Sequence, residues 1–146
     1  MNAEAETAAQ KFLSGYNCAQ AVLYACCEDI GLSKNTALKI ASGFGAGMGR
    51  NQEVCGAVAG AIMALSVKHG REENEEYTAT EKTYEKIRDI MGKFQVQHGS
   101  YLCRELLNGC NLQTEEGQKY FRENNLKNTV CKECVRSAVQ IVKEIL

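Results

Sequence analysis

The sequence predicts an all-α fold, a single-domain multi-helix bundle of about six or seven helices with a glycine-rich interhelical loop, over residues 1–146. Three observations lead to this prediction. Apolar residues recur at helical spacing in most segments, and no segment alternates apolar and polar residues as a half-buried strand does. The chain contains no proline, so no residue of that kind interrupts a helix. Its length is also sufficient for a core of its own.

The first three helices are recognised by their ends. A helical pattern covers residues 3–13 and stops just before a glycine. Asn17 is the expected N-cap of a second helix, which runs through Ile30 and ends at Gly31. Ser33 is the expected cap of a third, short helix, which leads into the glycine-rich loop.

Alternating glycines mark this loop, which precedes a central helix expected at residues 53–69. Glycine backbone can take positive φ and approach another group closely. We therefore expect the loop to be the cofactor-binding segment, through Gly45, Gly47, Gly49 and Arg50. Cys55 is expected in the first turn of the central helix, where the helix dipole and the nearby arginine favour its thiolate. Because Gly60 and its small neighbours permit close packing, the central helix should be the most buried element.

The second half of the chain continues the helical pattern. A long helix with a narrow apolar stripe is expected within residues 71–98, where acidic residues at its start complement the helix dipole. His69 and His98 each precede a glycine, which is typical of a helix C-cap. The last three helices are expected at residues 102–108, 114–125 and, capped by Asn128 or Thr129, through 146.

Composition narrows the function classes. The net charge is −1 and no basic stripe occurs, so we expect no nucleic-acid partner. The most apolar run is bracketed by charges and is too short to span a bilayer, so we expect no membrane segment. The acidic start lacks the features of a signal peptide, which indicates a cytoplasmic protein. In that compartment the eight cysteines should be metal ligands, redox thiols or core residues rather than a static disulfide framework.

Four of the cysteines fall near predicted helix starts and border apolar faces. A helix N-terminus favours the thiolate, which is both the nucleophile and the metal ligand. We therefore expect one site formed by Cys18, Cys55, Cys103 and Cys131. Soft thiolates select iron–sulfur clusters, zinc or copper(I). Cys131 and Cys134 alone have chelate spacing, and the role of the remaining cysteines is left open: Cys26, Cys27, Cys110 and Cys134.

These residues resemble the C_GCAxxG_C_C family of putative redox-active proteins. The resemblance rests on residues 16–19, 45–50, 55–60 and 103–106 together with Cys131, and it covers nearly the whole chain. The family name places glycine before cysteine, whereas this core reads Cys55-Gly56-Ala57. The resemblance implies a small redox protein, whose four family cysteines correspond here to Cys18, Cys55, Cys103 and Cys131.

Three functional interpretations remain open at this point. In the first, the four cysteines hold an iron–sulfur-type or other soft metal centre for electron transfer. In the second, they are redox thiols that cycle between dithiol and disulfide, with Cys55 as the attacking thiolate and Cys103 or Cys131 as the resolving thiol. In the third, the cysteines are structural and the protein is a helical adaptor. Whether the protein is an enzyme is left open; the expected partner is a redox protein, and a homo-oligomer is not excluded.

Overall fold

The computed structural model describes residues 2–146, and within them it contains seven helices of eight or more residues and no strand beyond one isolated bridge. The all-α prediction is therefore confirmed. The long helices are α1 (Ala3–Leu13), α2 (Cys18–Ile30), α3 (Lys34–Ala41), α5 (Gly56–His69), α6 (Thr78–His98), α8 (Glu115–Glu123) and α9 (Lys132–Ile145). The short segments are η1 (Ser42–Phe44), α4 (Gly45–Met48), α7 (Cys103–Leu106) and the π-helical η2 (Lys127–Cys131).

Both ends of α2 are fixed as the sequence predicts. The Asn17 side chain accepts a hydrogen bond from the Gln20 N–H, and the Gln20 side chain accepts one from the Asn17 N–H. This reciprocal capping box satisfies two donors that a helix start leaves unpaired. The helix ends at Gly31, whose φ of 67° is left-handed. Cys18 is consequently held as the first residue of α2.

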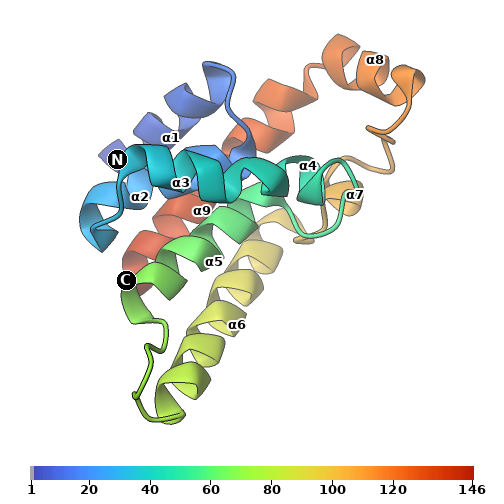
Figure 1. The fold of residues 1–146 in the computed structure, drawn as a ribbon. Helices are drawn as coiled ribbons and strands as arrows, with labels where there is room; N and C mark the ends of the chain where they lie inside the picture. The colour runs from blue at the N-terminus through green and yellow to red at the C-terminus, as the bar shows by residue number, and fades with distance from the viewer. Residues whose placement is uncertain (1) are drawn as a thin grey trace.

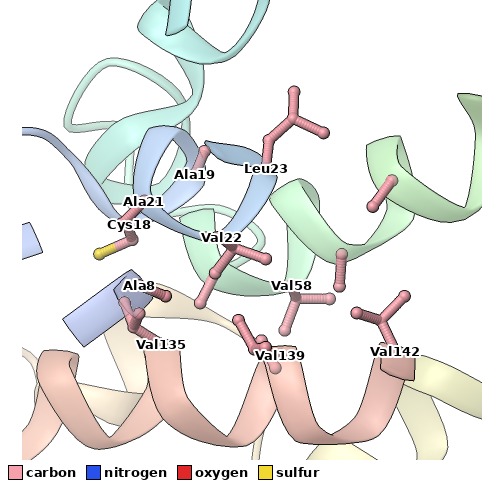
Figure 2. Close-up of a cluster of buried hydrophobic side chains, with 14 of the residues drawn as sticks. Ala8, Cys18, Ala19, Ala21, Val22, Leu23, Val58, Val135, Val139 and Val142 are labelled. Atoms are coloured by element: carbon pink, nitrogen blue, oxygen red, sulfur yellow. The ribbon is translucent and has the colours of Figure 1, made fainter. Parts of the chain in front are cut away.

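The core lies between α2, α5 and α9, with α1 and α6 completing it (Figure 1). Figure 2 shows valines from all three helices meeting, with Cys18 at one end of the cluster. Val22, Val58 and Val139 are fully buried there. Burial of such side chains is the main driving force for assembling the bundle. None of the helices described in residues 2–146 is both long and apolar enough to cross a bilayer.

Helix α5 is the most buried long helix, as predicted, with eight of its 14 residues buried against seven of 13 in α2. Glycine permits its closest contact. A Cβ on Gly60 would lie 2.8 Å from the carbonyl oxygen of Ala19 and 2.9 Å from the Cβ of Val22. Both distances are below van der Waals contact, so α2 and α5 can cross this closely only because Gly60 has no side chain.

The long helix α6 begins later than predicted. It starts at Thr78 rather than at residue 71, because the intervening acidic residues form a turn of their own. In that turn the Glu75 carboxylate accepts the N–H of Glu72, and Asn74 takes a left-handed φ of 69°. Local side-chain bonding of this kind competes with helix formation.

Gly60→Ala should lower the free energy of unfolding by about 1–3 kcal/mol, because the added methyl group meets backbone that cannot move aside. Gly92→Ala on α6 is the matched control. A Cβ at Gly92 meets nothing within 4 Å, so the helix-propensity gain should stabilise the protein by about 0.5–1 kcal/mol. Denaturant melts of the two variants measure the difference, and equal effects would contradict the close-packing argument.

Candidate functional site

A cavity of about 310 Å³ opens where several helices begin at one end of the bundle. Its wall includes residues from α1, α2, α7 and α8 and from the starts of α5 and α9. Five cysteines line it: Cys18, Cys55, Cys103, Cys131 and Cys134. The structure thus brings the four cysteines singled out by the sequence to one place and adds a fifth, Cys134. Their roles as redox thiols or metal ligands stay predictions.

Backbone pairing explains how two distant helix starts meet. Residues 52–55 and 101–104 lie antiparallel, with an isolated bridge between Val54 and Leu102. The Cys55 N–H donates to the Tyr101 carbonyl at 2.8 Å, and the Cys103 N–H donates to the Glu53 carbonyl at 2.7 Å. Helices α5 and α7 begin directly after this pairing, so it places Cys55 and Cys103 side by side at the cavity.

The glycine-rich loop takes an unusual left-handed path. Residues 46–50 all have positive φ, between 54° and 69°, and three of them are not glycine: Ala46, Met48 and Arg50. Left-handed backbone costs about 1–2 kcal/mol at each such residue. Ala46 and Arg50 line the cavity. Strain of this kind is often concentrated at functional sites.

Of the four loop residues expected to bind a cofactor, only Arg50 lines the cavity. Gly45, Gly47 and Gly49 do not line the cavity. A Cβ on Gly45 would overlap the Asn17 side chain at 2.5 Å, and one on Gly47 would lie 2.5 Å from the Gln52 Cα. Gly45 and Gly47 therefore permit close packing of the loop on its neighbours, whereas a Cβ on Gly49 would meet nothing within 4 Å. A cofactor-binding role for the three glycines stays a prediction.

The Gln52 side chain joins the glycine-rich loop to the connection between α7 and α8. It is only 6% exposed and has a left-handed φ of 57°. Its Nε2 donates to the Cys110 carbonyl at 2.7 Å, and its Oε1 accepts the Leu112 N–H at 2.9 Å. Both polar atoms of a buried amide are thereby satisfied. These two hydrogen bonds hold the α7–α8 connection against the strained loop.

The pKa of the Cys55 thiol is lowered. Cys55 is the N-cap residue of α5 rather than a residue of the first turn, because the helix begins at Gly56 and not at residue 53 as predicted. The Cys134 thiol, which donates a hydrogen bond to Cys55, is the main cause of the lower pKa, and the N–H groups of Ala57 and Val58 act in the same direction against burial. The sulfur makes no full capping hydrogen bond. Arg50, expected to assist, is not among the causes.

The pKa values of Cys134 and Cys18 are both raised. The pKa of Cys134 is strongly raised, mainly because its thiol donates to Cys55 and also because it is buried. Cys18 is paired in the same way with Cys131, and this hydrogen bond, followed by burial, raises its pKa. The charges of Cys55 and Cys134 also act on Cys18, so the two sulfur pairs are neighbours in the cavity.

The position of Cys131 differs from the prediction. Asn128 and Thr129 do not cap the last helix, because helical structure already begins at Lys127 as a π-helical segment. The Thr129 N–H donates to the carbonyl of Asn125, whose φ of 54° is left-handed. Cys131 therefore lies about a turn inside the helix, where the dipole of the N-terminus is weak. Cys103 lies in the first turn of its helix as predicted, although α7 covers only Cys103–Leu106, and burial raises its pKa to about 12.

The other cysteines and both histidines lie away from the cavity. Cys26 and Cys27 are buried in the core, and Cys110 Sγ donates to the Gly117 carbonyl at 3.1 Å. His98 ends α6 as predicted, where its Nε2 lies 2.9 Å from the Ser137 hydroxyl and its ring stacks on Phe94. Across residues 2–146, no group of three or more His, Cys, Asp or Glu side chains is arranged to hold a metal ion.

The geometry of the five cysteines agrees with the comparison to known protein families. A family model described as "Putative redox-active protein (C_GCAxxG_C_C)" matches residues 16–145. The chain belongs to the C_GCAxxG_C_C family. The description names redox activity and no metal or substrate. No curated protein matches the chain, and no solved structure matches it.

Two residues of the site are not recognisable from the sequence. Cys134 has the three-residue spacing from Cys131 that marks a chelate, but nothing in that spacing indicates contact with Cys55. Gln52 carries no signal, because a lone glutamine after a glycine-rich loop is typical of solvent-exposed turns. Each depends on contacts with residues far away along the chain.

The fully buried Cys26 should make the reduced protein less stable in alkali. Burial raises its pKa to about 12, whereas a thiol in the unfolded chain titrates near about 8.5. Between these values the unfolded chain releases a proton that the folded chain retains, so stability falls by about 1.4 kcal/mol per pH unit for such a thiol.

Cys26→Ala should make this pH dependence shallower by about one proton, measured from denaturant melts of reduced protein between about pH 9 and 11. Val22→Ala is the control, because it also removes buried volume from α2 but no titrating group. Identical slopes for wild type and Cys26→Ala would contradict the assignment.

Proposed function

We propose that the protein is a thiol–disulfide exchange protein in which Cys55 attacks a disulfide and Cys134 resolves the product. The observation that carries the proposal is that Cys55 and Cys134 line the same cavity, with Cys55 at the N-terminus of the long helix α5 and with its pKa lowered mainly by the Cys134 thiol. A stabilised thiolate beside a protonated thiol is the arrangement that exchange requires. The family description supports redox chemistry in general.

The exchange proceeds in two balanced steps. The Cys55 thiolate attacks one sulfur of a substrate disulfide, a mixed disulfide forms, and the other sulfur leaves as a thiolate. The leaving thiolate takes the proton of Cys134. Cys134 then attacks Cys55 Sγ, which forms a Cys55–Cys134 disulfide and releases the second substrate thiolate. The substrate gains two electrons and the protein dithiol loses them; a dithiol reductant reverses the change.

The neighbouring Cys18–Cys131 pair supports a second candidate function. Five thiols around one cavity, two of them with Cys-x-x-Cys spacing, favour a soft metal. No three of the cavity sulfurs are arranged so that they could hold one metal ion. The arrangement therefore suits two separate thiol pairs better than a single metal centre. An iron–sulfur or other metal centre and a redox partner protein therefore remain alternatives within this proposal. Structural cysteines would not require two thiol pairs at one cavity.

Alkylation of reduced, metal-free protein at several pH values, followed by mass spectrometry, tests the exchange proposal. Cys55 should react first and show an apparent pKa below that of an ordinary thiol, because Cys134 and the α5 N-terminus stabilise its thiolate. Cys134→Ala should raise that pKa and slow labelling near neutral pH several-fold. Cys110→Ala is the control, because Cys110 lies outside the cavity. Faster labelling of Cys26 or Cys110 would overturn the assignment.

Oxidation with one equivalent of a small disulfide provides the second arm. The expected product links Cys55 to Cys134, as identified by peptide mapping, and Cys134→Ala should stop at a mixed disulfide on Cys55. Linkage of other cysteines would refute the proposed pair. Metal analysis of anaerobically purified protein distinguishes the alternative: bound metal that is lost from Cys18→Ser, Cys55→Ser and Cys131→Ser alike would favour the metal centre.

A further inference from the structure

The charges around the cavity have one sign. Three cationic side chains line it, Arg50, Arg122 and Lys127, and no aspartate or glutamate does. The chain as a whole carries 17 Lys and Arg against 18 Asp and Glu. A cationic cavity in a nearly neutral protein therefore reflects local arrangement rather than overall composition. Cations of this kind attract anionic ligands and raise their local concentration.

Arg50 belongs to the glycine-rich loop, whereas Arg122 and Lys127 lie close together in the sequence, in α8 and η2. None of the three has a carboxylate partner within residues 2–146. The ion pairs of Arg104, Arg136 and Lys143, for example, lie elsewhere. The Lys127 Nζ lies 5.3 Å from the centre of the Phe12 ring, which forms part of the cavity wall. Two features hold the Arg50 backbone in place. The loop of residues 46–50 has left-handed φ values, and Gln113 Nε2 donates to the Arg50 carbonyl at 3.0 Å.

The size and depth of the cavity favour a small molecule over a folded protein. Its volume of about 310 Å³ is near the lower end of the range for small-molecule sites, about 300–1,000 Å³. Cys55 is 6% exposed and Cys134 only 1%, so a disulfide on a flat protein surface would not reach them. Apolar side chains such as Phe12, Leu107 and Phe121 form the walls, which suits a ligand with an apolar part.

We propose that this cavity binds a small disulfide bearing carboxylate groups, with the carboxylate at Arg50, Arg122 and Lys127 and the sulfur–sulfur bond at Cys55. The inference rests on the proposed exchange function and adds the class of substrate. The bond changes are those of the two exchange steps above: the substrate disulfide is reduced to two thiols, and Cys55 and Cys134 are oxidised. The cations take no part in electron transfer; they select and orient the anion.

Two small aromatic disulfides test the charge selection. One is 5,5′-dithiobis(2-nitrobenzoate), which carries two carboxylates, and the other is 4,4′-dithiodipyridine, which is neutral at pH 8. The rate constant of the Cys55 phase, defined as the phase missing from Cys55→Ser, is measured for each. Their ratio cancels any change in the amount of thiolate, so it reports only discrimination by charge.

Arg122→Gln should lower the ratio of anionic to neutral rate constants about fivefold, the effect of one unit charge at about 4 Å in water. Arg50→Gln should act in the same direction, and high salt should reduce the wild-type ratio. Arg88→Gln is the matched control: it removes the same charge from an exposed position on α6 outside the cavity. Cystamine, a cationic disulfide, should react faster relative to the neutral probe in Arg122→Gln than in wild type.

The outcomes separate the two proposals. An unchanged ratio in both Arg50→Gln and Arg122→Gln, with thermal melts that show folded protein, would overturn the anionic substrate and leave the exchange function standing. An equal fall in Arg88→Gln would also overturn it, because the effect would then come from net charge. Absence of a Cys55 phase with the neutral probe would instead overturn the exchange function itself.

Discussion

The close crossing of α2 and α5 is the contact on which the site depends. A Cβ on Gly56 would lie 2.9 Å from the Phe44 carbonyl oxygen and 3.1 Å from the Cys18 Cβ, and Gly60 packs as closely one turn later. Without side chains at these two positions, the first turns of α2 and α5 lie in direct contact. Cys18 and the N-cap Cys55 are therefore neighbours although 37 positions separate them in the sequence. The valine core beneath them holds the crossing in place (Figure 2).

The glycine-rich loop completes the cavity, but its left-handed backbone lowers the stability of the fold. Three non-glycine residues of the loop, Ala46, Met48 and Arg50, take left-handed backbone, at a cost of about 1–2 kcal/mol each. The hydrogen bonds of Gln52 and the antiparallel pairing of residues 52–55 with 101–104 hold that conformation. A relaxed loop would leave Arg50 and Cys55 in different surroundings.

Local signals made much of the fold predictable, and long-range contacts explain what was missed. The bounds of α2 follow from Asn17, Gln20 and Gly31, because a cap is a local interaction that the sequence displays. The burial of α5 likewise follows from its small residues. The last helix was placed too late, since the π-helical turn at Lys127–Cys131 has no sequence rule as clear as an N-cap. The relation of Cys134 to the cavity is not visible in the sequence for another reason: a pairing with Cys55 depends on how α9 packs against α5.

The electrostatics of the cavity explain why five similar thiols need not act alike. Burial raises the pKa of Cys103 to about 12 and contributes to the raised pKa of Cys18 and Cys134. At Cys55, by contrast, the Cys134 thiol and the N-terminus of a long helix act together, and the pKa is lowered. Each thiolate formed in the cavity would also raise the pKa of the neighbouring thiols, because like charges repel. In the proposed exchange function Cys55 is therefore the nucleophile, and in the proposed substrate selection the cations around it attract the anionic disulfide.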